Sequence, residues 1–533
     1  MGSHMRIAIV GGGPGGLFAA TLAKTNDPAR EVTVFERNRA DDTFGFGVVF
    51  SDATLERIHE ADPVLRTALD EHGVHWDPIE VRLRGERFRC HGNGMAAVER
   101  RALLRLMQEH ATDAGVDVRF STEVDPEALL AAGYDLVVAA DGANSGLRRL
   151  FPDVFEPSEE TATAKFIWLG TTYPFDGLTF VHERGQHGTF AVHGYPIGNG
   201  VSTFIVETDE ATWRAAGLDE FDVTQPPGPS DEKSQQYLQR LFAEQIDGHP
   251  LLLNNSRWGN FRTRRAQTWR HRVGGTALAL LGDSAHTAHF SVGSGTKMAL
   301  EDAIALVAAL DEHGDDVDAA LAAYESVRQP QVAKIQGSAR PSLSWWETFG
   351  RSHDALPPWQ FTYHVLTRSL TDSKLRRRDD HYVASVHECW QQAHGAPPLD
   401  TPIEVAGQHL PGRRVLVGAG TVHLPGGDLP LRDGPAVDGS TWGLAVTAPD
   451  TEEQLPPVLD AVAKAAADGT SLIAVSGGTA LTRRLLCEAA RLEHGTVALL
   501  VEDVDPALAE DVALTAVLSG RVDLVAAGPG VDA

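Results

Sequence analysis

Apolar and polar positions follow two different rhythms along this chain. Short, nearly unbroken apolar runs lie at 6–10, 31–36, 134–145 and 277–286, and such runs are typical of buried parallel strands. The segment 14–25 between the first two has the pattern of a helix, so the chain opens with a βαβ unit. These runs predict a doubly wound α/β domain.

A period of two replaces this pattern in the middle of the chain. The aromatic-bearing segments 165–173, 188–196 and 201–208 alternate in the way expected of strands that pack one face against a core. They predict an antiparallel sheet inserted into the α/β domain. The segment 225–232, rich in Pro and Gly, predicts a loop.

The pattern changes again after a Pro- and Gly-bearing break at 391–402. Apolar strands at 471–478, 495–503 and 522–530 are then separated by Ala-rich helical stretches. We expect one domain over 5–395, with dinucleotide-type α/β parts at about 5–165 and 270–390 and a sheet insert at about 166–269. A small α/β domain over 396–533 follows.

Composition narrows the class of protein. The 533 residues are 42% hydrophobic and 22% charged, with a formal net charge of −27. This charge argues against nucleic acid as a partner. No apolar stretch reaches 18 residues and no secretory signal precedes Met5, after a leading tag-like MGSH, so we expect a cytoplasmic protein that does not enter a membrane. The three cysteines match no metal spacing, and no metal site is expected.

A glycine motif follows the first strand. Gly11, Gly13 and Gly16 form G-x-G-x-x-G at the start of a helix, where glycines allow a pyrophosphate to approach the helix N-terminus. Glu36 ends the next strand, where a carboxylate can accept hydrogen bonds from ribose hydroxyls. An ordinary strand-turn-helix corner is the alternative, and the motif alone does not separate FAD from NAD.

Two later turns favour FAD. Asp141 and Gly142 end one apolar strand, and Asp283 ends another, before a glycine-rich turn that opens a helix. Asp283 could accept a hydrogen bond from a ribityl hydroxyl, and that helix would direct its positive end towards a flavin ring. A nicotinamide dinucleotide needs neither turn.

These motifs together resemble a known family. GGGPGG…FER, RALL, ADGANSGLR and GDSAH…GSG…LEDA are similar to the single-component flavoprotein aromatic hydroxylases over about residues 5–390. DDTFGFGVVFSDATLERI, FIWLGT, STFIVET and GDSAHTAHFSVGSGTKMALEDAIAL resemble the branch that acts on salicylyl-CoA and anthraniloyl-CoA. Phe290 and Lys297 stand where most of the wider family has Pro and Asn, as they do in that branch.

The resemblance implies a Rossmann-like FAD-binding domain, FAD as cofactor and NADH or NADPH as a transient co-substrate. The residues expected to bind FAD are Gly11, Gly13, Pro14, Gly16, Glu36, Arg37, Val49, Arg100, Asp141, Gly142, Asp283, Gly293, Gly295 and Thr296. Arg100 is expected at the phosphate and ribityl part of FAD, with a helix-surface ion pair as the alternative.

The loop 43–52 is expected to pack against the flavin ring and shape the substrate pocket. The expected catalytic residues are His289, Phe290, Val48 and Phe50. A substrate contact is as plausible as a packing role for His289, whereas His286 is expected to pack inside its motif. A buried loop that touches no ligand is the alternative for 43–52.

A CoA thioester requires a basic site. If 261–272 is one strand, Arg262, Arg264, Arg270 and Arg272 share a face that can bind phosphates. Arg262, Arg264, His289 and Ser291 are therefore the expected substrate-binding residues. A solvated surface with acidic partners is the alternative, and 374–380 is a second basic candidate.

The tail resembles the beginning and end of an old-yellow-enzyme-type barrel. About 130 residues cannot form an eight-stranded barrel, which needs around 250. We therefore expect a shrunken barrel remnant without FMN, in which the turn at 476–479 is a plain turn.

The sequence thus predicts 5-hydroxylation of salicylyl-CoA to gentisyl-CoA with NAD(P)H and O2. Alternatives are hydroxylation of a free or carrier-bound aromatic acid, and a flavin-binding scaffold with idle redox chemistry. The expected partners are the aromatic acyl-CoA and O2, and a homodimer is possible in principle.

Overall fold

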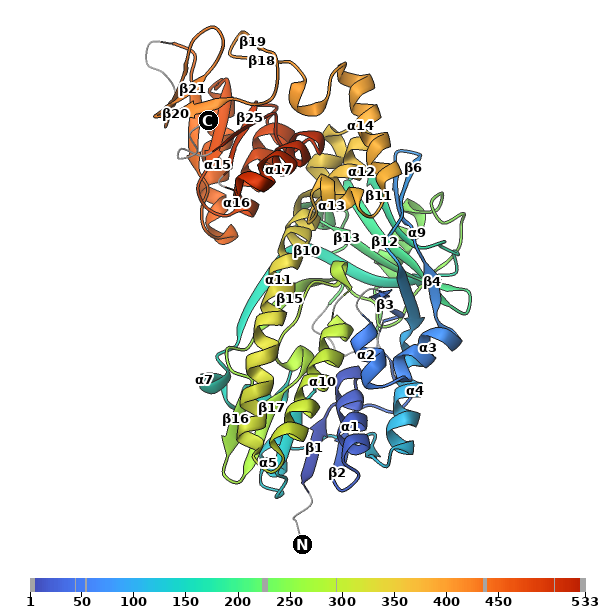
Figure 1. The fold of residues 1–533 in the computed structure, drawn as a ribbon. Coiled ribbons are helices and arrows are strands. Elements are labelled where there is room, and N and C mark those ends of the chain that lie inside the picture. Colours follow the sequence, from blue (N-terminus) through green and yellow to red (C-terminus); the bar gives the residue numbers. More distant parts are fainter. Residues whose placement is uncertain are drawn as a thin grey trace. The chain divides into compact units, whose positions relative to one another are not determined.

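A computed structural model describes residues 5–43, 45–52, 55–222, 229–293, 295–434, 439–502 and 504–527 (Figure 1). The chain forms two compact units. Unit 1 comprises 1–82 and 93–347, and unit 2 comprises 83–92 and 348–533. Part of the predicted loop at 225–232 lies outside the described residues.

A six-stranded sheet forms the base of unit 1. Its order is β16-β17-β9-β1-β2-β8, and every neighbouring pair is parallel except β16 and β17. The strands are β1 (Arg6–Val10), β2 (Glu31–Phe35), β8 (Asp117–Arg119), β9 (Leu136–Ala139), β16 (Arg270–Val273) and β17 (Thr276–Leu280). The predicted parallel strands and the doubly wound fold are confirmed.

Two helices of this layer lie side by side: α1 (Pro14–Asn26) and α10 (Gly295–His313) (Figure 1). Gly15 of α1 allows this close approach, because a Cβ there would lie 2.7 Å from Leu281 and 3.0 Å from Ala299. The approach brings the helices that follow β1 and β17 together on the same sheet.

An antiparallel sheet forms the second layer of unit 1. Its strands run in the order β14 (Leu251–Leu252), β10 (Ser158–Thr171), β13 (Val201–Thr208), β12 (Gly188–Gly198), β11 (Leu178–Gly185) and β5 (Ile79–Leu83), and β15 (Gly259–Arg265) also pairs with β10. One face carries an apolar core with Phe190, Phe204 and Phe242. The opposite face carries a different set of side chains, described with the site below.

Two expectations about strands are wrong. The loop predicted over 43–52 contains β3 (Gly47–Ser51), which pairs with β7 (Met95–Glu99), itself paired with β4 (Val74–Trp76). The predicted single strand over 261–272 is two strands, β15 and β16, which belong to different sheets. Arg262 and Arg264 therefore do not share a strand face with Arg270 and Arg272.

The remaining helices of unit 1 connect these layers. They are α2 (Glu56–Ala61), α3 (Val64–His72), α4 (Arg100–Asp113), α5 (Pro126–Leu130), α6 (Gly146–Leu150), α7 (Pro152–Phe155), α8 (Glu210–Ala215), α9 (Glu232–Leu241) and the start of the 39-residue α11 (Val317–Ala355).

Unit 2 joins the tail to helices that precede it. It contains β6 (Glu86–Cys90), the end of α11, α12 (Pro358–Leu366), α13 (Asp372–Arg376), α14 (Asp380–His394) and the hairpin β18 (Ile403–Val405) and β19 (Gln408–Leu410). The sequence predicted a domain boundary near residue 395, whereas the compact unit that contains the tail already includes residues from 348 onward. That residues 5–395 fold as a domain by themselves stays a prediction.

A seven-stranded sheet fills the tail. It runs β20 (Leu416–Gly418), β21 (Thr421–His423), β22 (Leu429–Arg432), β23 (Gly443–Thr447), β24 (Leu472–Ser476), β25 (Ala498–Glu502) and β26 (Leu524–Ala527), with α15 (Leu455–Ala467), α16 (Ala480–Glu488) and α17 (Pro506–Leu518). The segment before β20 hydrogen-bonds to β26, since Val415 N–H donates to the Val525 carbonyl at 3.1 Å. The sheet is therefore nearly closed, as a shrunken barrel requires.

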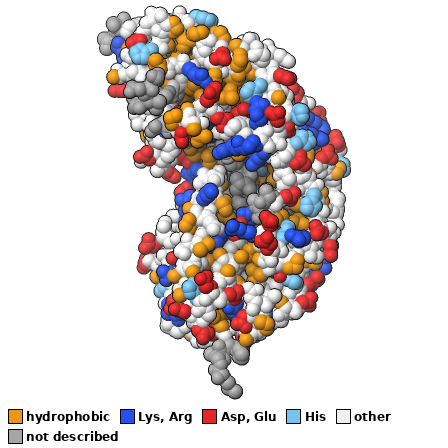
Figure 2. Space-filling view, in the orientation of Figure 1, with side chains coloured by type: hydrophobic (Ala, Val, Ile, Leu, Met, Phe, Trp, Pro, Cys, Tyr) orange, Lys and Arg blue, Asp and Glu red, His pale blue; other side chains and the backbone are white. Residues whose placement is uncertain are grey.

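Acidic and basic side chains are interspersed over the face shown in Figure 2. Across the described part of the chain, every helix is too short or too polar to cross a bilayer.

Candidate functional site

The glycine turn after β1 is built for close packing. Gly11 has φ +113°, and a Cβ there would lie 2.2 Å from the Ala140 carbonyl oxygen. A Cβ on Gly16 would lie 2.1 Å from the Gly11 carbonyl oxygen. Gly13 differs, because a Cβ there would meet no atom within 4 Å, and Pro14 begins α1 beside this open space. The turn can therefore admit a ligand phosphate at the helix N-terminus.

Glu36 fastens this turn to β2. Its carboxylate accepts hydrogen bonds from the Gly12 N–H at 2.7 Å and from the backbone and side-chain N–H groups of Asn38, both at 2.8 Å. Arg37 is exposed. The predicted ribose contact of Glu36 stays a prediction, and the structure adds a role in shaping the turn.

The loop after β9 is locked to the loop after β17. Arg148 donates to the Ser284 carbonyl at 2.5 Å and to the Ala143 carbonyl at 2.6 Å. Asp141 accepts from the Gly146 N–H at 2.7 Å through one oxygen, while its other oxygen is buried without a hydrogen-bond partner. Gly142 beside it has φ +80°. The two aspartate turns predicted from the sequence thus form one rigid edge.

Asp283 and Arg100 interact electrostatically. The Asp283 side chain is exposed, although many protein atoms surround its carboxylate. This burial raises the pKa of Asp283, against the opposing effects of His286, Arg100 and Arg264. Burial likewise lowers the pKa of Arg100, whose Nε is buried without a hydrogen-bond partner.

These features test whether the residues fit FAD. Buried polar groups in native proteins are nearly always hydrogen-bonded. Arg100 Nε and one oxygen of Asp141 have no hydrogen-bond partner among the described residues, and a Cβ on Gly13 at the α1 N-terminus would meet no atom within 4 Å. A group with phosphates and ribityl hydroxyls would satisfy all three, so the residues fit FAD.

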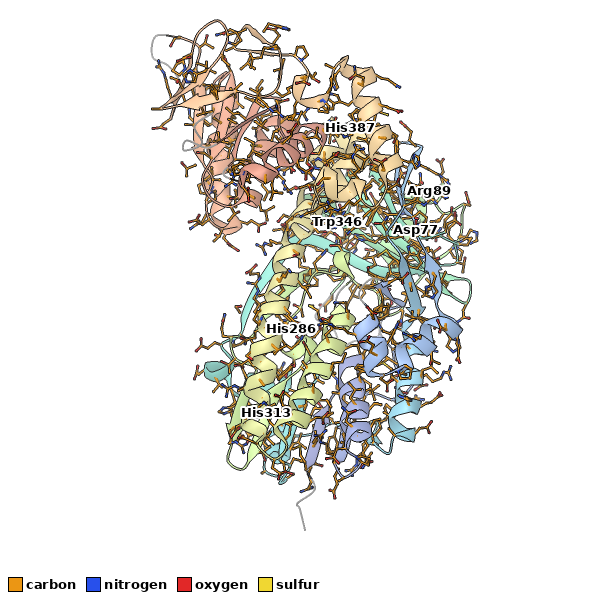
Figure 3. The ribbon with its side chains drawn as sticks, in the orientation of Figure 1. Asp77, Arg89, His286, His313, Trp346 and His387 are labelled. Atoms are coloured by element: carbon orange, nitrogen blue, oxygen red, sulfur yellow. The ribbon has the colours of Figure 1, made fainter. Side chains whose placement is uncertain are left out.

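His286 supports this edge and packs inside the fold, as predicted (Figure 3). Its Nε2 lies 2.7 Å from Asp302, whose carboxylate also accepts from Gly282 N–H at 3.1 Å and from Arg328 at 2.7 Å. Burial alone would raise the pKa of Asp302, but His286 and Arg328 hold it below its ordinary value. Asp302 therefore stays ionised and fixes the turn.

Strand β3 places its side chains on opposite sides. Val48 and Phe50 are buried in the main core of unit 1, so the structure gives these two expected catalytic residues a packing role. Val49 points the other way, and a Cβ on Gly293 would lie 3.4 Å from its Cγ1. Val49 and Gly293, both expected at FAD, are thus neighbours.

The turn before α10 carries the other expected residues. Gly293 has φ +61°, and Gly295 and the partly buried Thr296 begin α10. Ser291 contacts His289 and Ser342, with oxygen-to-nitrogen and oxygen-to-oxygen distances of 2.7 and 2.9 Å.

Phe290 joins this turn to the antiparallel sheet. Its ring centroid lies 5.0 Å from that of Phe166, 5.7 Å from Trp168 and 6.1 Å from Phe261. All four rings are partly exposed. We call these residues the aromatic wall, and such a surface suits a flat apolar ring.

Three buried polar side chains lie behind the aromatic wall: His193 on β12, Glu207 on β13 and His289. The Nε2 atoms of His193 and His289 lie 3.3 and 3.8 Å from the same oxygen of Glu207. Sequence reasoning missed His193 and Glu207. Both residues occupy strand positions that face away from the apolar core. In an alternating strand such polar positions are normally interpreted as exposed to solvent, so the pattern gave no sign that these two are buried.

The expected CoA-binding arginines have acidic partners. Arg262 and Arg264 both pair with Glu159, at 3.2 and 2.7 Å. Arg270 pairs with Glu325 at 3.4 Å, and Arg272 with Asp318 at 2.8 Å. Arg262 and Arg264 thus share one carboxylate as their ion-pair partner, whereas Arg270 and Arg272 each have a carboxylate of their own.

Comparisons with known proteins agree with this geometry. The sequence profile of the FAD binding domain family matches residues 4–339. A Streptomyces protein named salicyloyl-CoA 5-hydroxylase is 56% identical over 528 residues, 98% of this chain and 99% of that protein. A Streptosporangium sibiricum protein named 3-hydroxy-4-methyl-anthranilyl-[aryl-carrier protein] 5-monooxygenase is 34% identical over 64% of this chain and 89% of its own length.

A solved structure shares the fold. The tetrameric form of 2-methyl-3-hydroxypyridine-5-carboxylic acid oxygenase superposes with a TM-score of 0.51 at 20% identity, and covers 65% of this chain and 94% of that one.

Proposed function

This chain belongs to the FAD binding domain family and is a flavoprotein aromatic monooxygenase, and we propose that it hydroxylates salicylyl-CoA at C5 to give gentisyl-CoA. The observation that carries the substrate is the 56% identity to a salicyloyl-CoA 5-hydroxylase along the full chain, tail included. The aromatic wall beside the FAD-binding edge is consistent with a ring substrate.

When bound and reduced by NAD(P)H, FAD would supply the two electrons that activate O2, one atom of which enters the ring while the other leaves as water. The residues of this chain position the cofactor and the substrate. The glycine turn and Arg100 would hold the FAD phosphates, Asp283 would bind the ribityl part, and Val49 and Gly293 would pack against the flavin ring. Phe290, Phe166 and Trp168 orient the aryl group and exclude water, which holds the reacting atoms at short range.

We also propose that a carrier-bound aryl substrate, which the sequence left open as an alternative, is disfavoured. The carrier-protein monooxygenase matches only 64% of this chain, whereas the CoA-dependent relative matches 98%. We further propose a cytoplasmic enzyme that acts on free small molecules, and a homodimer as its assembly.

The test is substrate-stimulated oxidation of NAD(P)H by the purified flavoprotein. Salicylyl-CoA should stimulate it strongly, whereas free salicylate and the carrier-bound salicyl group should not. Benzoyl-CoA lacks the electron-donating hydroxyl and should at most cause oxidation without product. Equal stimulation by free salicylate would overturn the CoA assignment, and no stimulation by any aryl compound would favour an idle scaffold.

A further inference from the structure

Strand β15 and helix α11 lie side by side (Figure 1) and enclose a narrow cleft. Two arginines, Arg265 of β15 and Arg340 of α11, line it together with buried side chains. These buried residues are Thr263, Ala288, His289, Gln336, Ala339 and Leu343. Because Arg265 is exposed, the positive charge stands at the solvent end of a buried cleft.

The inner end of the cleft adjoins the aromatic wall. The ring centroid of His289, which lines the cleft, lies 4.9 Å from that of Phe261 and 4.2 Å from that of Phe290. The cleft therefore leads from an exposed arginine to the rings that suit an aryl group.

Strand β15 links the two ends of the cleft. Side chains alternate along a strand, so Phe261, Thr263 and Arg265 share one face of β15. Arg262 and Arg264 take the opposite face, where both pair with one carboxylate. A rise of about 3.3 Å per residue places Arg265 about 13 Å along the strand from Phe261. The arginine that continues the face of the aromatic wall is thus Arg265.

An amide, and no carboxylate among the described residues, holds the Arg265 side chain. Its Nε donates to the side-chain oxygen of Gln336 at 2.7 Å. Gln336 in turn donates to the carbonyls of Arg264 at 3.0 Å and Thr287 at 2.7 Å, which fixes its own position. An amide leaves the positive charge of Arg265 intact, and a guanidinium held in one orientation can bind a phosphate through two N–H groups.

We propose that this cleft takes the pantetheine arm of the aryl-CoA and that Arg265 binds the CoA diphosphate at its solvent end, with Arg340 as a second positive charge. This inference rests on the proposed function and names the part of the site that recognises CoA. The aryl ring lies against the aromatic wall, the arm follows the buried lining, and the diphosphate reaches Arg265. Arg262 and Arg264, on the other face of β15, remain candidates for the third phosphate, which the ribose of CoA carries.

A nicotinamide dinucleotide also carries a diphosphate, but the shape of the cleft favours CoA. In NAD(P)H a ribose and a ring base flank the diphosphate on both sides. In CoA one side is a slender arm, which suits a narrow, buried cleft better than a nucleoside does. The cleft also ends at the rings expected to hold the aryl group, where the arm of CoA is attached.

The first test measures binding without turnover. Oxidised flavoprotein is titrated with salicylyl-CoA and with the salicyl thioester of N-acetylcysteamine, which keeps the ring and the thioester but has no phosphate. The change in flavin absorbance reports binding. Arg265→Ala should raise Kd for salicylyl-CoA about tenfold or more, as expected for a lost hydrogen bond to a charged group, and should leave Kd for the short thioester unchanged. Arg265→Lys should keep part of the affinity, because it keeps the charge but loses the two-pronged geometry.

The matched control is Lys334→Ala. Lys334 is an exposed cation of α11 that, like Arg265, takes part in no ion pair within the described part of the chain. It lies two residues before Gln336, and helix positions two apart do not share a face. Lys334→Ala should therefore bind both thioesters as wild type does. Arg340→Ala should weaken binding of salicylyl-CoA selectively but less than Arg265→Ala, because Arg340 also contacts Glu160.

Steady-state kinetics identify the source of the diphosphate. In Arg265→Ala, KM for salicylyl-CoA should rise, while kcat and KM for NAD(P)H stay close to those of wild type. A rise in KM for NAD(P)H with an unchanged Kd for salicylyl-CoA would assign the cleft to the nicotinamide cofactor and overturn the inference. Equal losses for both thioesters, no loss for either, or the same loss in Lys334→Ala would overturn it as well. If salicylyl-CoA binds through Arg265 but wild type forms no hydroxylated product from it, the proposed function alone fails.

Discussion

Single residues in this protein have neighbours that make their roles testable one by one. Arg100 and Arg101 are adjacent, but Arg100 carries a buried Nε at the FAD-binding edge while Arg101 is exposed on α4. Substituting each arginine in turn therefore distinguishes a loss of FAD binding from a mere change of surface charge.

Arg100→Ala should weaken FAD binding by about 1.5–3 kcal/mol, the range for a hydrogen bond to a charged group. This is roughly a tenfold to hundredfold rise in Kd, measured by fluorescence titration of apoprotein with FAD. Arg101→Ala is the control and should bind FAD as wild type does. Equal binding by both variants would remove Arg100 from the FAD site.

A second residue-scale prediction concerns CoA. Among the described residues, Arg262 and Arg264 share one ion-pair partner, Glu159, so together they are better placed to hold a phosphate than arginines that each have their own carboxylate. The double variant Arg262→Ala/Arg264→Ala should raise KM for salicylyl-CoA more than for a salicyl thioester without the nucleotide, and should spare kcat.

Arg270→Ala/Arg272→Ala is the matched control, since Glu325 and Asp318 neutralise those arginines one to one. Steady-state kinetics with both thioesters should show no selective effect. An unchanged KM in the first double variant would assign Arg262 and Arg264 to the solvated surface.

At the scale of elements, the strand-turn-helix at the start of the chain depends on backbone approach. A Cβ on Gly16 would lie 2.1 Å from the Gly11 carbonyl, whereas a Cβ on Gly13 would meet nothing within 4 Å. Gly16→Ala should therefore cost on the order of 3 kcal/mol or prevent folding, and Gly13→Ala should cost less than about 1 kcal/mol. Urea unfolding of the apoproteins measures both, and similar costs would contradict the packing described.

The buried charges of unit 2 predict its response to acid. Glu488 lies 2.7 Å from Arg351, 3.0 Å from Arg521 and 3.8 Å from His364. Burial alone would raise the pKa of Glu488, but Arg351, His364 and Arg521 lower it to about 2. Burial and Arg521 lower the pKa of His364 to about 3.

Both shifts make acid destabilising. The unfolded chain protonates its histidine below about pH 6.5 and its glutamate below about 4.3, before the folded unit does. Stability should thus decline as pH falls from 6.5 towards 2. Glu488→Gln should cost about 3 kcal/mol at pH 7, because it leaves buried cations without their anion.

Glu493→Gln is the control, because Glu493 contacts the same Arg351 at 3.0 Å but is 42% exposed. It should cost less than about 1 kcal/mol. Thermal unfolding against pH measures both variants, and stability that does not change between pH 7 and 3 would contradict this account of the cluster.

Elements defined by local pattern could be predicted from the sequence, and those defined by distant partners could not. β1, α1 and β2 follow from their own residues. β3 was expected to be loop because its partner, β7, lies more than 40 residues further on. The strands β15 and β16 were joined in error because the intervening Ala266 and Trp269 are buried and apolar like strand residues. Glu207 was missed because only the fold reveals which face is enclosed.

At the scale of the whole molecule, the two compact units have different boundaries from the two domains expected from the sequence. Every residue expected at FAD lies in unit 1, whereas the tail forms unit 2 together with α12, α13 and α14. Gln360 of α12 donates to the Leu518 carbonyl at 3.0 Å, and Ser373 contacts Asp511 at 2.6 Å. The sequence showed that the pattern of apolar residues changes at 391–402. It did not show that the helices before this segment pack against the tail.

The central claim is that this flavoprotein places oxygen on C5 of salicylyl-CoA. The ring hydroxyl activates C5, which is para to it and less crowded than C3. The thioester deactivates the carbons meta to it, including C5, less than those ortho and para to it. The most direct measurement is mass spectrometry and NMR of the product formed from salicylyl-CoA, NAD(P)H and O2. The account predicts gentisyl-CoA with an intact aromatic ring, and a 3-hydroxylated ring, a dihydro product or efficient hydroxylation of benzoyl-CoA would contradict it.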